Sequence, residues 1–171
     1  DPAQHWGVMA GLARRVDGNP DWSSIWVYDH VHTVPRPLEE TTHEAWALMA
    51  AFAGVTGRVR LGQMCTCMGY RNPAYLAKVA ATVDVISEGR LEMGIGAGWF
   101  DGEHDTHGIP FPATGERFDR LEEQLAVITG LWETPVGETF SFDGQHYPVR
   151  NSPALPKPVQ SIPPVLIGGG G

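Results

Sequence analysis

The sequence predicts an α/β fold built on a parallel sheet. Strand patterns and helix patterns alternate along most of the chain, and polar or glycine residues follow each strand at its carboxyl end. Repeated strand–helix units form parallel sheets with the helices outside. Ligands of such sheets bind at the carboxyl ends of the strands. We therefore expect one binding site along that edge.

Helices are predicted where apolar residues recur at helical spacing between capping signals. Asn72 and Pro73 have the residue types of an N-cap and a first helical position. Thr41 and Glu44 have the spacing of a capping box. The predicted helices are residues 4–16, 45–55, 73–87 and 115–132.

Strands are predicted where apolar, β-branched or aromatic residues form short runs. These runs are residues 24–30, 58–67, 91–95 and 165–167. Residues 100–113 are predicted to be a loop. Residues 138–147 are predicted to be a hairpin that turns at Asp143 and Gly144, and a proline-rich connector covers residues 153–164. We interpret residues 1–171 as a single domain that contains the segment 138–164 as an insertion.

The segment of residues 86–99 has glycine at alternate positions, namely Gly94, Gly96 and Gly98. One face of this strand and its exit loop therefore has no side chains, and a flat ligand could lie against the main chain there. Alternatively, these glycines only permit close packing of helix and strand. The spacing differs from the dinucleotide-binding fingerprint, and no helix begins within it.

Composition excludes several classes of protein. The chain of 171 residues is 42% hydrophobic and 19% charged, as in ordinary globular domains. A formal net charge of -8 argues against binding to nucleic acid or to an acidic membrane surface. No apolar run is long enough for a membrane span and no signal peptide pattern is present. We expect a small-molecule partner.

Cysteine and histidine usage indicates neither a disulfide nor a metal site. Cys65 and Cys67 lie two residues apart on a predicted strand, which is too close for an unstrained disulfide. Free thiols favour a cytoplasmic protein. His104 and His107 lie among acidic residues, and we interpret this segment as a solvated loop rather than a metal site.

The predicted strand ends bring a particular set of residues to one edge. Asp29 and His30 end the first strand, and the segment from Thr66 to Tyr70 follows the second. Ala97 to Trp99 follow the third, and Gly168 to Gly171 follow the last. These segments are expected to form one site.

Several segments together resemble the luciferase-like monooxygenase superfamily, and most closely its coenzyme F420-dependent oxidoreductases. The matching segments keep the order and spacing of that family along the whole chain. They are residues 26–30, 70–73, 76–84, 87–91, 94–99 and 163–169.

The resemblance implies a (β/α)8 TIM barrel, of which this chain matches about strands two to five. Such barrels typically have about 250 residues. Four strands cannot close a barrel, so we expect the sequence to be a fragment of a longer protein. The resemblance also implies a deazaflavin, coenzyme F420, lying across the strand ends, and hydride transfer between it and a small organic substrate. A homodimer is expected as well.

The resemblance assigns roles to residues at the predicted edge. His30 is similar to the residue that takes a proton from the substrate hydroxyl, and Asp29 is expected to fix its tautomer and help hold the ring. A non-prolyl cis peptide is expected near Gln63 and Met64, behind the middle ring. The other residues expected to contact the cofactor are Thr66, Ala97, Gly98, Gly168, Gly169 and Gly170.

Trp99 departs from the pattern of the sugar-phosphate dehydrogenases in this group, which have a glutamate there that protonates the cofactor. Tryptophan cannot deliver that proton, so glucose 6-phosphate oxidation is not expected. Trp99 and Tyr70 are instead expected to line the substrate pocket. Two alternatives stay open: a monooxygenase that uses FMN, and a non-catalytic barrel fragment that binds a flavin or dimerises.

Overall fold

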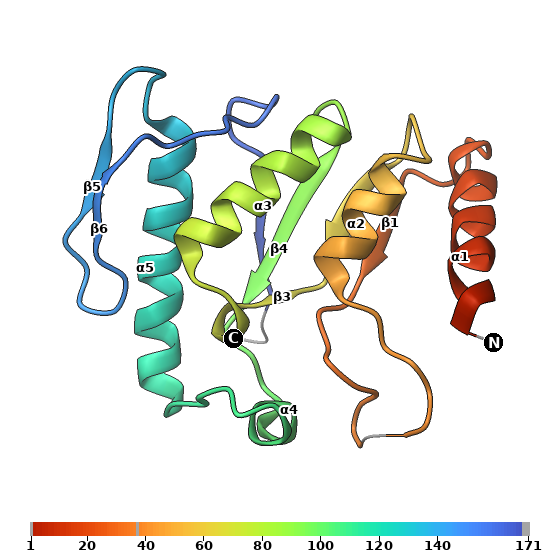
Figure 1. Cartoon of the computed structure of the whole chain (residues 1–171), viewed down its shortest axis with the longest axis horizontal. Helices are drawn as coiled ribbons and strands as arrows, with labels where there is room; N and C mark the ends of the chain where they lie inside the picture. Colours follow the sequence, from red (N-terminus) through yellow and green to blue (C-terminus); the bar gives the residue numbers. More distant parts are fainter. Residues whose placement is uncertain (1, 37, 169–171) are drawn as a thin grey trace.

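The computed structural model describes residues 2–36 and 38–168 and has the predicted α/β architecture (Figure 1). Its helices are α1 (Pro2–Asp17), α2 (Ala45–Ala53), α3 (Pro73–Ile86), α4 (Asp101–Thr106) and α5 (Thr114–Glu133). Its strands are β1 (Ser24–Val27), β2 (Arg60–Gln63), β3 (Thr66–Cys67), β4 (Leu91–Gly96), β5 (Phe140–Phe142), β6 (Val149–Ser152) and β7 (Val165–Ile167). A 3-10 turn, η1 (Met68–Tyr70), follows β3.

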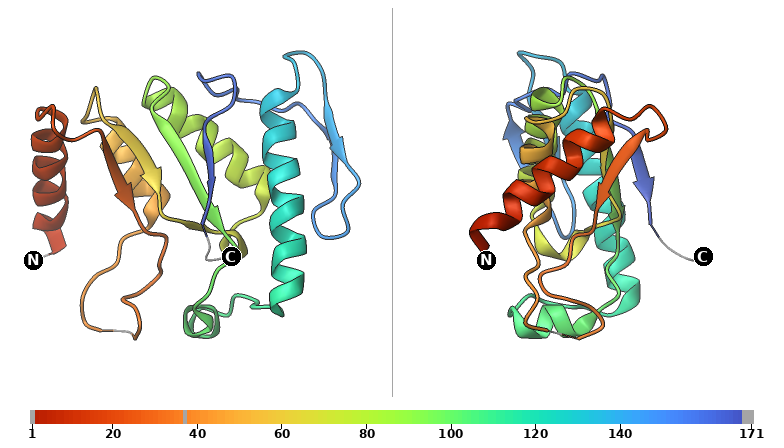
Figure 2. Two further views of the ribbon diagram at one scale, coloured as in Figure 1. Left: turned by 180° about the vertical axis from the view of Figure 1, so that it is seen from behind. Right: turned by 90° about the vertical axis from the view of Figure 1, so that its right-hand side faces the viewer.

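The main sheet is parallel, as predicted, and β4 lies at its centre. β1 pairs with β2, and β4 pairs with β2, β3 and β7, each in parallel. The helices α2 and α3 lie on one side of these strands (Figure 2). Because the strands run the same way, their carboxyl ends share one edge, close to α4 (Figure 1).

The predicted strand 58–67 is interrupted and forms both β2 and β3. Leu61 pairs with Leu91 before the break and Thr66 pairs with Ile95 after it. The segment between these pairs is one residue longer than the β4 segment that it faces, so it contains a bulge. The non-prolyl cis peptide joins Met64 to Cys65, one residue later than the predicted position near Gln63 and Met64.

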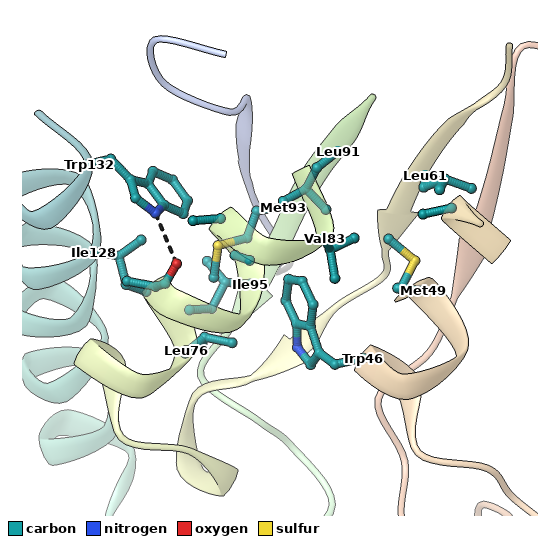
Figure 3. Close-up of a cluster of buried hydrophobic side chains, with 14 of the residues drawn as sticks. Trp46, Met49, Leu61, Leu76, Val83, Leu91, Met93, Ile95, Ile128 and Trp132 are labelled. Atoms are coloured by element: carbon teal, nitrogen blue, oxygen red, sulfur yellow. Dashed lines mark hydrogen bonds between the residues drawn. The ribbon is translucent and has the colours of Figure 1, made fainter. Parts of the chain in front are cut away.

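The hydrophobic core lies between the sheet and its helices (Figure 3). Leu91, Met93 and Ile95 alternate along β4 and are fully buried on the side that faces the helices. Trp132 at the end of α5 is also buried, and its indole N–H donates a hydrogen bond of 3.1 Å to the carbonyl of Ala77 in α3. This core fixes the helices against the strands whose ends form the site.

One of the two predicted helix caps is present. Asn72 caps α3, and its side-chain oxygen accepts hydrogen bonds from the backbone N–H groups of Ala74 and Tyr75. The capping box before α2 is wrong, because Glu44 is itself the N-cap and its carboxylate accepts from the backbone N–H of Ala47.

Two predicted connections differ from the structure. Residues 100–113 are not simply a loop, because α4 forms within them. The hairpin extends from β5 to β6, and a connection of residues 143–148 replaces the predicted two-residue turn. Glu123 of α5 holds this connection, because its carboxylate accepts hydrogen bonds from the backbone N–H groups of Gln145, His146 and Tyr147.

None of the helices in the described part of the chain is long and apolar enough to cross a membrane.

Candidate active site

A cavity of about 480 Å³ opens at the carboxyl ends of the parallel strands. This volume is typical of sites for small molecules and cofactors. Many residues expected at the site line it: Asp29, His30, Met64, Thr66, Tyr70, Ala97, Gly98, Trp99 and Gly168. Residues that had been given no individual role at the site also line it: Cys65, Cys67, Gly96, Phe100, Glu103, His104, Thr114, Arg117 and Phe118. The predicted convergence of the strand ends is confirmed.

His30 follows β1 and is hydrogen-bonded to Glu103 of α4. Its Nδ1 lies 2.7 Å from Oε2 of Glu103, and the other carboxylate oxygen accepts from the backbone N–H of Val31 at 2.8 Å. Burial alone raises the pKa of Glu103, but these hydrogen bonds outweigh it and its pKa lies below the ordinary value. The ionised carboxylate therefore holds a proton on Nδ1 and leaves Nε2 for other chemistry.

Asp29 does not orient His30, which corrects the sequence prediction. Its carboxylate is buried and forms a two-pronged ion pair with Arg71, with N–O distances of 2.6 and 2.9 Å. It also accepts a hydrogen bond from the backbone N–H of Cys67. Arg71 additionally contacts Glu44 at the start of α2. Asp29 thus ties the end of β1 to the residues after β3, and the prediction that it contacts a cofactor stays untested.

A buried thiol–imidazole pair forms another part of the wall. Nε2 of His104 lies 3.7 Å from Sγ of Cys67, and Nδ1 lies 3.1 Å from the carbonyl of Pro110. The carbonyl only accepts, so Nδ1 is protonated and Nε2 accepts from the thiol. Burial lowers the pKa of His104 and raises the pKa of Cys67 to about 11. The pair is therefore neutral near pH 7, and the thiol is not an activated nucleophile.

Tyr70 also lies against this wall, with its ring centroid 5.1 Å from that of His104. Burial and the nearby acidic groups raise the pKa of Tyr70. Tyr70 therefore stays protonated near pH 7.

The bulge between β2 and β3 supplies part of the floor. The hydroxyl of Thr66 donates to Oε1 of Gln63 at 2.5 Å, and both residues are fully buried. Gln63 does not line the cavity, whereas the side chain of Met64 does and is 64% exposed. Gln63 therefore supports the bulge from behind.

The alternating glycines are explained in part by close packing. A side chain at Gly94 would collide with the carbonyl oxygen of Gln63 at 1.8 Å. The prediction of a bare ligand-binding face is therefore wrong at Gly94. Gly96 and Gly98 do line the cavity, and Gly98 has a φ of +75° that favours glycine.

Two expected cofactor contacts, Gly169 and Gly170, lie outside the described residues. Sequence reasoning missed Glu103 and Arg117. Arg117 donates to the carbonyl of Gly98 at 2.6 Å and lies over the ring of Phe111. The spacing of Phe100, Glu103 and His104, at positions i, i+3 and i+4, was a helical signal that could have revealed the buried face of α4.

A family model and several known proteins match this chain. The family model described as luciferase-like monooxygenase matches residues 22–171. An uncharacterized protein of Mycobacterium tuberculosis is 31% identical over 96% of this chain and 62% of its own length. An F420-dependent glucose-6-phosphate dehydrogenase of Amycolatopsis mediterranei is 34% identical over 86% of this chain and 43% of its own length.

Solved structures share the fold. An F420-dependent secondary alcohol dehydrogenase in complex with an F420–acetone adduct matches with a TM-score of 0.77 and 27% identity, over 94% of this chain and 46% of its own. The monooxygenase RslO1 of Streptomyces bottropensis matches with a TM-score of 0.79 and 22% identity, over 98% of this chain and 48% of its own. The chain thus spans about half of these barrels and has a partial luciferase-like TIM-barrel fold. It belongs to the luciferase-like monooxygenase family, and its relatives include an F420-dependent dehydrogenase.

Proposed function

We propose that the protein transfers hydride between coenzyme F420 and a small organic substrate, with His30 as the residue that exchanges the substrate proton. The observation that carries the proposal is the pairing of His30 with ionised Glu103 at a cavity on the strand ends. Relatives described as F420-dependent support the choice of cofactor.

The residues present fit a planar redox ring. Main chain of Gly96, Ala97 and Gly98 lines the cavity, and backbone there can approach a ring closely and offer N–H donors. Met64 and Cys65 at the bulge line the cavity as well. F420, when bound, supplies the two-electron chemistry of hydride transfer.

The chain itself supplies proton transfer and orientation. In the direction of oxidation, Nε2 of His30 takes the proton of the substrate hydroxyl. Hydride leaves the carbon that carries this hydroxyl for the bound cofactor, and the carbon–oxygen single bond becomes a double bond. Glu103 stabilises the imidazolium that forms, since its carboxylate lies 2.7 Å from Nδ1. In the reverse direction the imidazolium returns the proton.

The test is cofactor binding followed by turnover, both with the full-length protein. Titration with F420 and, separately, with FMN is followed by absorbance and fluorescence. We expect saturable binding of F420. Binding of FMN alone would favour the monooxygenase alternative, and binding of neither would overturn both.

The variant His30→Ala tests the role of the imidazole. We expect F420 binding to be retained and kcat to fall by about 10²- to 10⁴-fold, the usual contribution of a general acid–base group. His107→Ala is the matched control, because His107 lies beside the same rim without lining the cavity. Unchanged turnover of His30→Ala would overturn the assignment and favour a non-catalytic role for this residue.

A further inference from the structure

We infer that the substrate is an alcohol or ketone with a single reacting oxygen on an apolar carbon skeleton, rather than a polyhydroxylated compound. This inference rests on the proposed function. It is argued from the side chains that surround His30 and from the hydrogen bonds already made by the polar wall of the cavity.

Aromatic side chains flank His30 on two sides. The ring of Tyr28 lies 5.3 Å from the His30 ring between centroids, and that of Trp99 lies 6.3 Å away in an edge-on arrangement. Trp99 contacts Phe100 in turn, at 5.4 Å. Trp99 and Phe100 line the cavity, so a group that reaches His30 from the cavity meets apolar ring surface on that side.

The apolar groups at the cavity are exposed rather than buried in the core. Trp99 is 67% exposed, Met64 is 64% exposed and Phe118 is 55% exposed, and all three line the cavity. Clustered exposed apolar side chains of this size mark a binding surface, because their burial by a ligand is favourable.

The polar side chains of the wall have protein partners. Asp29 pairs with Arg71, Thr66 donates to Gln63, and Cys67 contacts His104. His30 pairs with Glu103. A ligand with several hydroxyl groups would therefore have to break hydrogen bonds within the protein to form its own.

Arg117 adds a positive charge to the cavity wall. Within residues 2–36 and 38–168 it is the one lysine or arginine that lines the cavity. Its guanidinium contacts the carbonyl of Gly98, the hydroxyl of Thr114 and the ring of Phe111, and its buried Nε has no hydrogen-bond partner among the described residues. Nε2 of His30 is the ring nitrogen available to the reacting substrate oxygen.

The test measures binding without turnover. The full-length protein is loaded with oxidised F420, and isothermal titration calorimetry gives the dissociation constants of methyl ketones whose alkyl chain grows from ethyl to pentyl. A ketone and the oxidised cofactor cannot react, so binding reaches equilibrium. We expect affinity to increase about fourfold per added methylene, as apolar burial predicts. Glucose 6-phosphate is expected to bind far more weakly than the longest ketone.

Two variants of the cavity lining locate the effect. Trp99→Ala and Phe118→Ala are each expected to weaken binding of the longest ketone about tenfold and to reduce the gain per methylene. Trp22→Ala is the matched control, since Trp22 is 57% exposed and lies outside the cavity. It should bind as the wild type does.

The outcomes separate the two proposals. Failure of F420 to bind overturns the proposed function. If F420 binds, three results overturn only the substrate class: affinity independent of chain length, glucose 6-phosphate binding as tightly as the longest ketone, or both cavity-lining variants behaving like Trp22→Ala.

Discussion

Glu103 combines burial with charge at the point where the proposed chemistry takes place. Its side chain is almost fully buried, yet hydrogen bonds from His30 and from the N–H of Val31 hold its pKa below the ordinary value. A buried carboxylate whose two oxygens are both occupied has little freedom to rotate. We therefore assign Glu103 as a positioning residue that fixes both the tautomer and the direction of His30.

We predict that Glu103→Gln lowers kcat by about a hundredfold while the dissociation constant of F420 stays unchanged. Glutamine retains the shape of the side chain but lacks the charge that stabilises the imidazolium. Steady-state kinetics and a fluorescence titration measure the two quantities.

Glu103→Asp keeps the charge and is expected to recover part of the lost kcat. If Glu103 had only a structural role, both variants would be less stable, and kcat and the affinity for F420 would fall together. Equal activity of Glu103→Gln and the wild type would contradict the assignment.

Individual site residues could be predicted from sequence where they lie at or just beyond the end of a predicted strand. His30, Thr66 and Gly98 follow that rule and do line the cavity. Glu103 lies 73 residues from His30, so no local pattern indicated their pairing. Asp29 was adjacent to His30 in sequence, but the competing guanidinium of Arg71 binds its carboxylate instead.

Among the elements, α3 connects the core to the site. Leu76 and Val83 are buried in the core, and the residues immediately before the helix include Tyr70 and Arg71 of the cavity region. Asn72 begins the helix by accepting two backbone N–H hydrogen bonds. The cap thus fixes where the segment of the site ends and the helix begins.

We predict that Asn72→Ala lowers the free energy of unfolding by about 1 kcal/mol, because the N–H groups of Ala74 and Tyr75 lose their acceptor. Urea denaturation measures the change. Asn72→Asp is the control, since aspartate caps equally well, and it should unfold at the wild-type midpoint. An equal loss of unfolding free energy in Asn72→Ala and Asn72→Asp would argue that the NH2 group of the side-chain amide, rather than the capping oxygen, is needed.

Elements were predictable where an apolar repeat was long. The helices and strands around the core were found for this reason, as was the parallel sheet. Helix α4 is only six residues long, and its buried face carries Glu103 and His104 rather than apolar residues. The hairpin connection depends on Glu123 in another helix, which the local turn residues did not reveal.

At the scale of the whole molecule, the cavity is assembled from segments distant in sequence. The end of β1, the bulge, the end of β4, α4 and the start of α5 each contribute to its lining. A ligand that contacts all of them links elements that unfolding would separate. Binding of this ligand is therefore expected to stabilise the whole fold. The homodimer expected from the sequence stays a prediction.

We predict that F420 at about a hundred times its dissociation constant stabilises the full-length protein by about 2.7 kcal/mol, as mass action requires for a ligand that binds the folded state alone. Thermal denaturation with and without the cofactor measures this stabilisation as a higher midpoint temperature of unfolding. Glucose 6-phosphate at the same concentration serves as the control and should leave the midpoint unchanged. An unaltered midpoint with F420 would contradict binding at this site.

The extra residue between Leu61 and Thr66 has a consequence for how this strand tolerates change. Parallel neighbours point to the same side, so Cys67 shares the side of Gly96, opposite to the core side of Ile95. Removing one residue from the segment would make it as long as the β4 segment that it faces, so the pairing of Thr66 with Ile95 would be kept and the bulge would be lost. Replacing a side chain there alters one contact, whereas a deletion would straighten the strand and withdraw Met64 and Cys65 from the cavity wall, so the number of residues in this segment matters more than their identity.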